Sequence, residues 1–98
     1  DPQVVFDMNV AAIRQCRFLV AITDGKDMGT LFECGYACAH SKDIVYVWID
    51  REKGAKFNIM LAKSARVVAL SFDELGDILS YFQRKGFLPL KNYKGELE

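Results

Sequence analysis

Three short runs of apolar, mostly β-branched or aromatic residues divide this chain, and helical segments stand between them. The runs cover residues 18–23, 44–49 and 65–70. Each run is apolar almost throughout, a pattern typical of strands that are buried on both faces of a sheet. Because strands that alternate with helices form parallel sheets, the sequence predicts an α/β fold with helices on both faces.

Helical character is found in residues 5–16, 30–40 and 58–63. A fourth helix is expected to open at a capping box, Ser71-Phe72-Asp73-Glu74, and to stop at Gly86. In three of these helices the apolar or small side chains fall on one face, and we expect the face of the fourth helix to pack inward. The faces consist of Val5, Met8, Ala12 and Cys16, of Leu31, Cys34, Gly35 and Cys38, and, in the fourth helix, of Phe72, Leu75, Ile78, Leu79 and Phe82.

Composition excludes several classes of function. Ninety-eight residues suffice for one small domain. Thirteen basic and thirteen acidic residues cancel, so the chain carries no basic footprint for nucleic acid. Neither an apolar run of about 18 residues for a membrane span nor a signal peptide is recognised. We therefore expect no contact with nucleic acid or membrane.

The three cysteines, Cys16, Cys34 and Cys38, lack the spacing of a disulfide framework and indicate reduced thiols in a cytoplasmic protein. Small buried side chains are the expected role of all three. Cys34, Cys38 and His40 suggest metal ligands by their proximity, but no second ligand pair stands elsewhere in the sequence. We therefore expect no metal site.

Carboxylates gather after the first apolar run. Asp24 and Asp27 lie in the following loop, and Glu33 lies in the first turns of the next helix. In an open α/β sheet, ligands bind beyond the carboxyl ends of the strands, and a helix N-terminus favours an ionised carboxylate. Asp24 and Lys26 are interpreted as solvated loop residues. Asp27 and Glu33 are the candidates for a site.

The eleven residues Asp27-Met28-Gly29-Thr30-Leu31-Phe32-Glu33-Cys34-Gly35-Tyr36-Ala37 resemble the signature of the nucleoside 2-deoxyribosyltransferase family, roughly Asp-x-Gly-Thr-x-(Phe/Trp)-Glu-x-Gly-Tyr-Ala. The resemblance extends over about residues 4–70 and implies a flavodoxin-like parallel sheet. It also implies that Glu33 is the nucleophile. Asp7, twenty residues before Asp27 as in the family, is implied to donate a proton to the base and to take one back.

The same resemblance assigns substrate-binding roles to Asp27, Gly29, Asn58 and Met60, the last two through an Asn-x-Met pair that contacts the sugar or orients the nucleophile. In the family this pair reaches across from a neighbouring subunit, so a homo-oligomer, a dimer or a hexamer, is implied. The implied substrates are a 2'-deoxyribonucleoside and a free nucleobase. The implied reaction exchanges the base in nucleotide salvage and needs no metal or organic cofactor.

Several alternatives remain open. Thr30 and Glu33 also fit a capping box, in which Glu33 reaches back to the backbone, and Asp27 fits a turn. Asn58 fits a helix cap and Met60 core filling. At the level of function, a hydrolase of deoxynucleoside 5'-monophosphates shares the nucleophilic glutamate. A non-catalytic nucleotide-binding or interaction module would keep only the fold.

Family members begin with a further strand, a loop that helps hold the nucleobase, and another helix and strand. Their first strand lies beside the one that corresponds to residues 18–23, which would otherwise present a bare apolar edge. We therefore expect residues 1–90 to form the carboxyl-terminal part of the family domain, or another chain to cover that edge. Residues 91–98 are expected to be a tail, whose final Leu97-Glu98 is typical of a cloning remnant before a purification tag.

Overall fold

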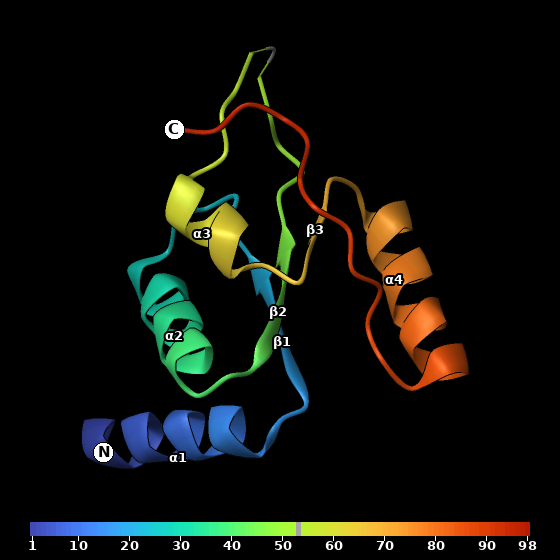
Figure 1. Ribbon diagram of the computed structural model, residues 1–98. Helices are drawn as coiled ribbons and strands as arrows, with labels where there is room; N and C mark the ends of the chain where they lie inside the picture. Colours follow the sequence, from blue (N-terminus) through green and yellow to red (C-terminus); the bar gives the residue numbers. More distant parts are fainter. Residues whose placement is uncertain (53) are drawn as a thin grey trace.

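The computed structural model describes residues 1–52 and 54–98, in which helices and strands alternate (Figure 1). In chain order the elements are α1 (Pro2–Gln15), β1 (Phe18–Ile22), α2 (Met28–Ala39), β2 (Asp43–Val47), α3 (Ile59–Ser64), β3 (Val67–Ala69) and α4 (Phe72–Lys85). Each predicted segment is present, with bounds shifted by a few residues. In these described ranges, no helix is both long and apolar enough to cross a membrane.

The strands form one parallel sheet in the order β1-β2-β3, with Val45 of β2 opposite Val20 on one side and Val67 on the other. The four residues from Ile44 to Val47 are at most 1% exposed. A central strand that is apolar on both faces must be covered on both. Figure 1 shows this cover, with α2 and α3 on one face and α4 on the other. The predicted flavodoxin-like α/β fold is confirmed.

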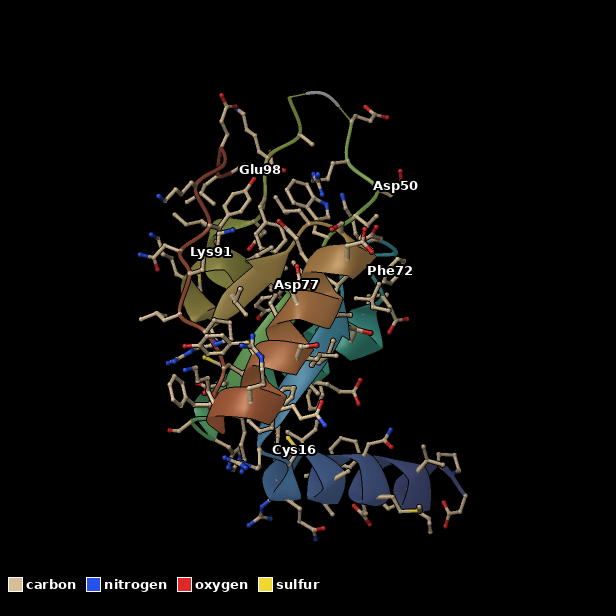
Figure 2. All side chains as sticks on the ribbon, turned by 90° about the vertical axis from the view of Figure 1, so that its right-hand side faces the viewer. Cys16, Asp50, Phe72, Asp77, Lys91 and Glu98 are labelled. Atoms are coloured by element: carbon tan, nitrogen blue, oxygen red, sulfur yellow. The ribbon has the colours of Figure 1, made fainter. Side chains whose placement is uncertain are left out.

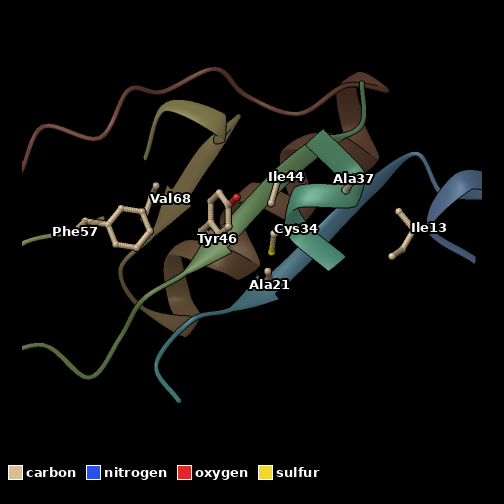
Figure 3. Packing of buried hydrophobic residues seen from close by; sticks show 8 residues of the cluster. All are labelled: Ile13, Ala21, Cys34, Ala37, Ile44, Tyr46, Phe57 and Val68. Atoms are coloured by element: carbon tan, nitrogen blue, oxygen red, sulfur yellow. The ribbon is translucent and has the colours of Figure 1, made fainter. Parts of the chain in front are cut away.

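The face under α2 and α3 carries the larger cluster of buried side chains, shown in Figure 3. Tyr46 is its largest fully buried member, and its hydroxyl shares a hydrogen bond of 2.7 Å with the hydroxyl of Ser64 at the end of α3. Burial raises the pKa of Tyr46 to about 12. The cluster consists of Ile13, Ala21, Cys34, Ala37, Ile44, Tyr46, Phe57 and Val68.

The opposite face packs against α4, whose ends follow the predicted signals. The hydroxyl of Ser71 accepts a hydrogen bond from the backbone N–H of Glu74 at 3.0 Å, and Gly86 ends the helix at a left-handed φ of 82°. The reciprocal half of the expected capping box is wrong, because the Glu74 carboxylate accepts from Leu70 instead of Ser71. The inward stripe is right for Ile78 and wrong for the terminal Phe72, which is 65% exposed.

α1 is attached mainly through its C-terminal end, where Ile13 is buried. Val5 and Met8 of its apolar stripe are 56% and 66% exposed. Figures 1 and 2 show why: α1 projects beyond the sheet and meets the rest of the fold at α2. The described elements leave Val5 and Met8 of this stripe largely uncovered.

β1 lies at one edge of the sheet, because among the described strands it is hydrogen-bonded to β2 alone. Val20 and Ile22, which face the side covered elsewhere by α4, are 39% and 55% exposed. The apolar edge expected for this strand is therefore open in the described chain.

Beyond α4 the chain returns along the sheet, and Figure 2 follows it from Lys91 to Glu98. Leu88, just before this return, is 2% exposed and packs in the buried cluster on the α4 face with Val67 and Ile78. The residues that the sequence sets apart as a tail are paired with the fold, because Leu97 forms a parallel bridge with Phe57.

Candidate active site

The loop after β1 is fastened to the end of β2 by Thr23 and Asp24. Thr23 donates its backbone N–H and its hydroxyl to the carbonyl of Val47, at 2.9 and 3.0 Å. The Asp24 carboxylate accepts from the backbone N–H of Ile49 at 3.0 and 3.1 Å and from that of Asp50 at 2.6 Å. The interpretation of Asp24 as a solvated loop residue is wrong. Its carboxylate joins the carboxyl ends of two strands.

Asp27 caps α2. Its Oδ2 accepts from the backbone N–H of Thr30 at 2.8 Å and from the Thr30 hydroxyl at 3.1 Å. A Cβ at Gly29 would stand 3.2 Å from the same oxygen, closer than ordinary van der Waals contact, so a small residue there suits the cap. The turn interpretation of Asp27 thus becomes a helix cap, while its Oδ1 accepts no hydrogen bond from the described residues.

Glu33 lies in the second turn of α2 and is half-buried. Because α2 begins at Met28 with Asp27 as its cap, the capping-box alternative for Thr30 and Glu33 is wrong. For the same reason, the helix macrodipole acts chiefly on Asp27, since its effect falls off within the first turn. Within residues 1–52 and 54–98 the Glu33 carboxylate has no hydrogen-bond partner.

A hollow of about 250 Å³ adjoins Glu33 along the open edge of β1. Its wall combines the apolar strand with one carboxylate and one hydroxyl, a composition suited to a small ligand that has apolar faces and a few polar groups. The lining residues are Leu19, Val20, Ala21, Ile22, Thr30 and Glu33.

Asp7 lies on the exposed helix α1, and its Oδ1 accepts a hydrogen bond of 2.9 Å from the side-chain amide of Gln3. The rings of Phe6 and Phe32 approach to 6.0 Å between centroids, which fixes this part of α1 beside the residue that precedes Glu33. Asp7 does not line the hollow at Glu33. The two are thus carried by neighbouring helices without a direct bond in the described structure.

Asn58 caps α3, so the alternative interpretation of Asn58 as a helix cap is confirmed. Its Oδ1 accepts from the backbone N–H groups of Met60 at 2.9 Å and Leu61 at 3.2 Å. Its amide nitrogen donates to no described residue and remains available as a donor. Met60 is 75% exposed, so the alternative role in core filling is wrong. Neither Asn58 nor Met60 lines the hollow at Glu33 within the chain.

Arg51 was missed by the sequence analysis. Its Nη1 donates to the carbonyls of Trp48 at 2.6 Å and Leu70 at 2.8 Å, and its guanidinium lies 5.7 Å from the Trp48 ring centroid. It therefore joins the ends of β2 and β3 as Asp24 joins those of β1 and β2. An arginine in the loop a few residues after a strand is the signal that could have found it, because the last carbonyls of a strand need donors.

The cysteines differ from one another in the structure. Cys34 is 1% exposed, and burial raises the pKa of its thiol. Cys38 is exposed, so the expectation of burial is wrong for it. Throughout the described part of the chain, no three His, Cys, Asp or Glu side chains are grouped so that they could hold a metal ion.

A sequence model described as nucleoside 2-deoxyribosyltransferase matches residues 1–73 of the chain. This span runs from α1 to the first residues of α4 and contains every candidate site residue. The chain belongs to the nucleoside 2-deoxyribosyltransferase family. The recognition made from the eleven-residue signature is confirmed.

Among curated proteins, none matches the chain significantly. Membership of the nucleoside 2-deoxyribosyltransferase family supports an activity of the transferase kind, without naming the reaction. Glu33, inside the matched span, is the half-buried carboxylate that borders the hollow along β1.

Proposed function

We propose that the protein is a nucleoside 2-deoxyribosyltransferase that exchanges the base of 2'-deoxyribonucleosides through a covalent deoxyribosyl-Glu33 intermediate. The observation that carries the proposal is the half-buried Glu33 carboxylate, which is unbonded within the described residues and borders the hollow along β1. Asp27 takes the capping role at α2. Glu33 is thereby left to react.

In the first half-reaction, a Glu33 oxygen forms a bond to C1' while the bond from C1' to the base nitrogen breaks. The electron pair of that bond leaves with the base, and Asp7 as a carboxylic acid supplies the proton that neutralises it. In the second half-reaction, an incoming base attacks C1', gives its proton back to Asp7 and releases Glu33. The two displacements follow the logic of retaining glycosidases, and their chemistry requires no metal or organic cofactor.

Asp27 and Gly29 would border the substrate, since they lie at the N-terminal end of α2, just before Thr30 of the hollow. Asn58 would donate its free amide N–H to the sugar or to a glutamate, and the exposed Met60 would pack on the sugar. Because neither lines the hollow of its own chain, we propose that both serve the Glu33 of a neighbouring subunit in a dimer or hexamer.

Incubation with 2'-deoxyadenosine and free cytosine, followed by chromatography, tests the function. Formation of deoxycytidine supports transfer, and Glu33→Gln should abolish it. Release of free deoxyribose instead would favour hydrolysis, and a deoxynucleoside 5'-monophosphate should then be the better substrate. No reaction with any of these by the full-length protein would favour a non-catalytic binding module. A cytoplasmic location agrees with the three free thiols.

Sedimentation tests the assembly. An open apolar edge at β1 and an exposed stripe on α1 favour association. We expect a dimer or larger, in which a segment or a subunit lies against β1. An active, well-behaved monomer with β1 open to solvent would contradict this.

A further inference from the structure

A short parallel pairing holds the backbone on both sides of Asn58. The N–H of Phe57 donates to the carbonyl of Glu96 at 2.9 Å, and the N–H of Glu98 donates to the carbonyl of Phe57 at 3.0 Å. The N–H of Ile59 then donates to the carbonyl of Glu98 at 2.8 Å. Asn58 thus lies between two residues that are bonded to the same extended segment, which Figure 1 shows running beside the approach to α3.

This pairing matters because α3 has only six residues. A helix of that length is not stable by itself and depends on tertiary contacts. At its C-terminal end, Ser64 is held by the buried hydroxyl of Tyr46. At its N-terminal end, the pairing with Glu96 and Glu98 supplies the corresponding restraint on Asn58.

Tyr93 packs the extended segment, residues 93–98, against the buried core. Its ring centroid lies 5.5 Å from that of Phe57 and 6.2 Å from that of Trp48, and Phe57 is itself only 3% exposed. A Cβ built on Gly95 would overlap the ring of Tyr93. The ring can occupy this position only because residue 95 is glycine.

We infer that Tyr93 is a positioning residue for Asn58. With Gly95 it fixes the extended segment against Phe57, and the segment fixes the backbone of Asn58 and its cap. The free amide nitrogen of Asn58 is then held in one direction. This inference rests on the proposed function, in which that nitrogen contacts the sugar or the nucleophile.

Four variants of the full-length protein test the inference: Tyr93→Ala, Tyr93→Phe, Gly95→Ala and the control Gly76→Ala. Tyr93→Ala removes the ring, whereas Gly95→Ala keeps the ring and displaces it. Tyr93→Phe retains the packing, since the hydroxyl makes no hydrogen bond with the described residues. Gly76 lies in α4, where an added Cβ meets nothing within 4 Å.

Two measurements are made on each variant: amide hydrogen exchange at Ile59, Met60 and Leu61, and kcat/KM for base exchange. Tyr93→Ala and Gly95→Ala should speed exchange at these amides and lower kcat/KM about 10- to 100-fold, because a misplacement of about 1 Å can cost 10²-fold. Tyr93→Phe and Gly76→Ala should match the wild type in both. The amides of Val45 and Val47 in β2 should stay slow throughout.

Faster amide hydrogen exchange with an unchanged kcat/KM in Gly95→Ala would overturn the positioning role of Tyr93. Unchanged hydrogen exchange at the amides of Ile59, Met60 and Leu61 would overturn it as well. Should Tyr93→Ala unfold, the β2 amides will reveal it, and Gly95→Ala then decides. Failure of the proposed function has a different signature, because the wild type and Gly76→Ala would then both lack base exchange. If only the positioning role fails, the wild type, Gly76→Ala and Gly95→Ala will all be active in base exchange.

Discussion

The carboxylate of Asp27 accepts two hydrogen bonds from Thr30, one from its backbone N–H at 2.8 Å and one from its hydroxyl at 3.1 Å. Thr30 is consequently inside the first turn of α2, and Asp27 caps the N-terminal end of the helix without Glu33. Two acidic residues of one short motif thus have separate tasks. Asp27 stabilises the helix, and Glu33 faces the hollow.

Asp24→Ala should destabilise the fold. The substitution leaves the backbone N–H groups of Ile49 and Asp50 without their acceptor, and the loss of such a partner costs about 1–3 kcal/mol. The unfolding free energy from urea titration measures the effect. Asp50→Ala is the matched control, because the Asp50 side chain is exposed and only its backbone takes part. Equal unfolding free energies of the two variants would show that the hydrogen bonds of the Asp24 carboxylate are dispensable for stability.

Asn58 allows its capping and binding roles to be separated. Asn58→Asp keeps an acceptor for Met60 and Leu61 but replaces the free amide donor with a carboxylate. We expect near wild-type stability and a large loss of kcat/KM, because a carboxylate would repel Glu33. Asn58→Ala should lose the activity and about 1 kcal/mol of stability as well. Full activity in Asn58→Asp would show that Asn58 is only a cap.

Asp7→Asn should slow base exchange by about 10²–10⁴-fold, the usual contribution of a positioned acid. A substrate whose leaving group needs no proton should be affected much less. Asp77→Asn, on the exposed face of α4, is the control and should change neither rate. Equal losses on both substrates would argue that Asp7 is structural, through its bond with Gln3.

Stability should fall in alkali. Burial raises the pKa of Tyr46 from 10.0 to about 12 and that of Cys34 above 9.0. The folded state therefore holds these protons more tightly than the unfolded chain, so stability is complete below about pH 9 and declines as the pH rises towards 12. Urea midpoints measured across this range should show the decline. Tyr46→Phe should make it shallower above pH 10, and an unchanged slope would contradict the assignment.

The order of helices and strands could be predicted because each strand is short, apolar and bounded by clear end signals, such as Ser71 and Gly86. Burial was less predictable. Val5, Met8 and Phe72 are apolar and lie on helices, yet they are more than half exposed, because the sequence does not say which neighbours will cover a stripe. Packing partners are a property of the whole assembly and not of the local pattern.

The site shows a similar division. The signature identified the helix that carries Glu33, but the hydrogen bonds by which Asp24 and Arg51 join strand ends depend on backbone groups of residues far away in the chain. Such bonds produce no periodic pattern in the sequence. Likewise, only the structure shows that Asn58 has one end engaged as a cap and the other end free.

Trapping of the covalent intermediate tests whether Glu33 is the nucleophile. The full-length protein is incubated with a slow 2'-deoxy-2'-fluoro nucleoside, digested and analysed by mass spectrometry, with Glu33→Gln in parallel. We expect a fluorodeoxyribosyl adduct on the peptide that carries Glu33, at Glu33 itself, and none in the variant. An adduct on Asp7, Asp27 or any other residue, or the same adduct in Glu33→Gln, would contradict it.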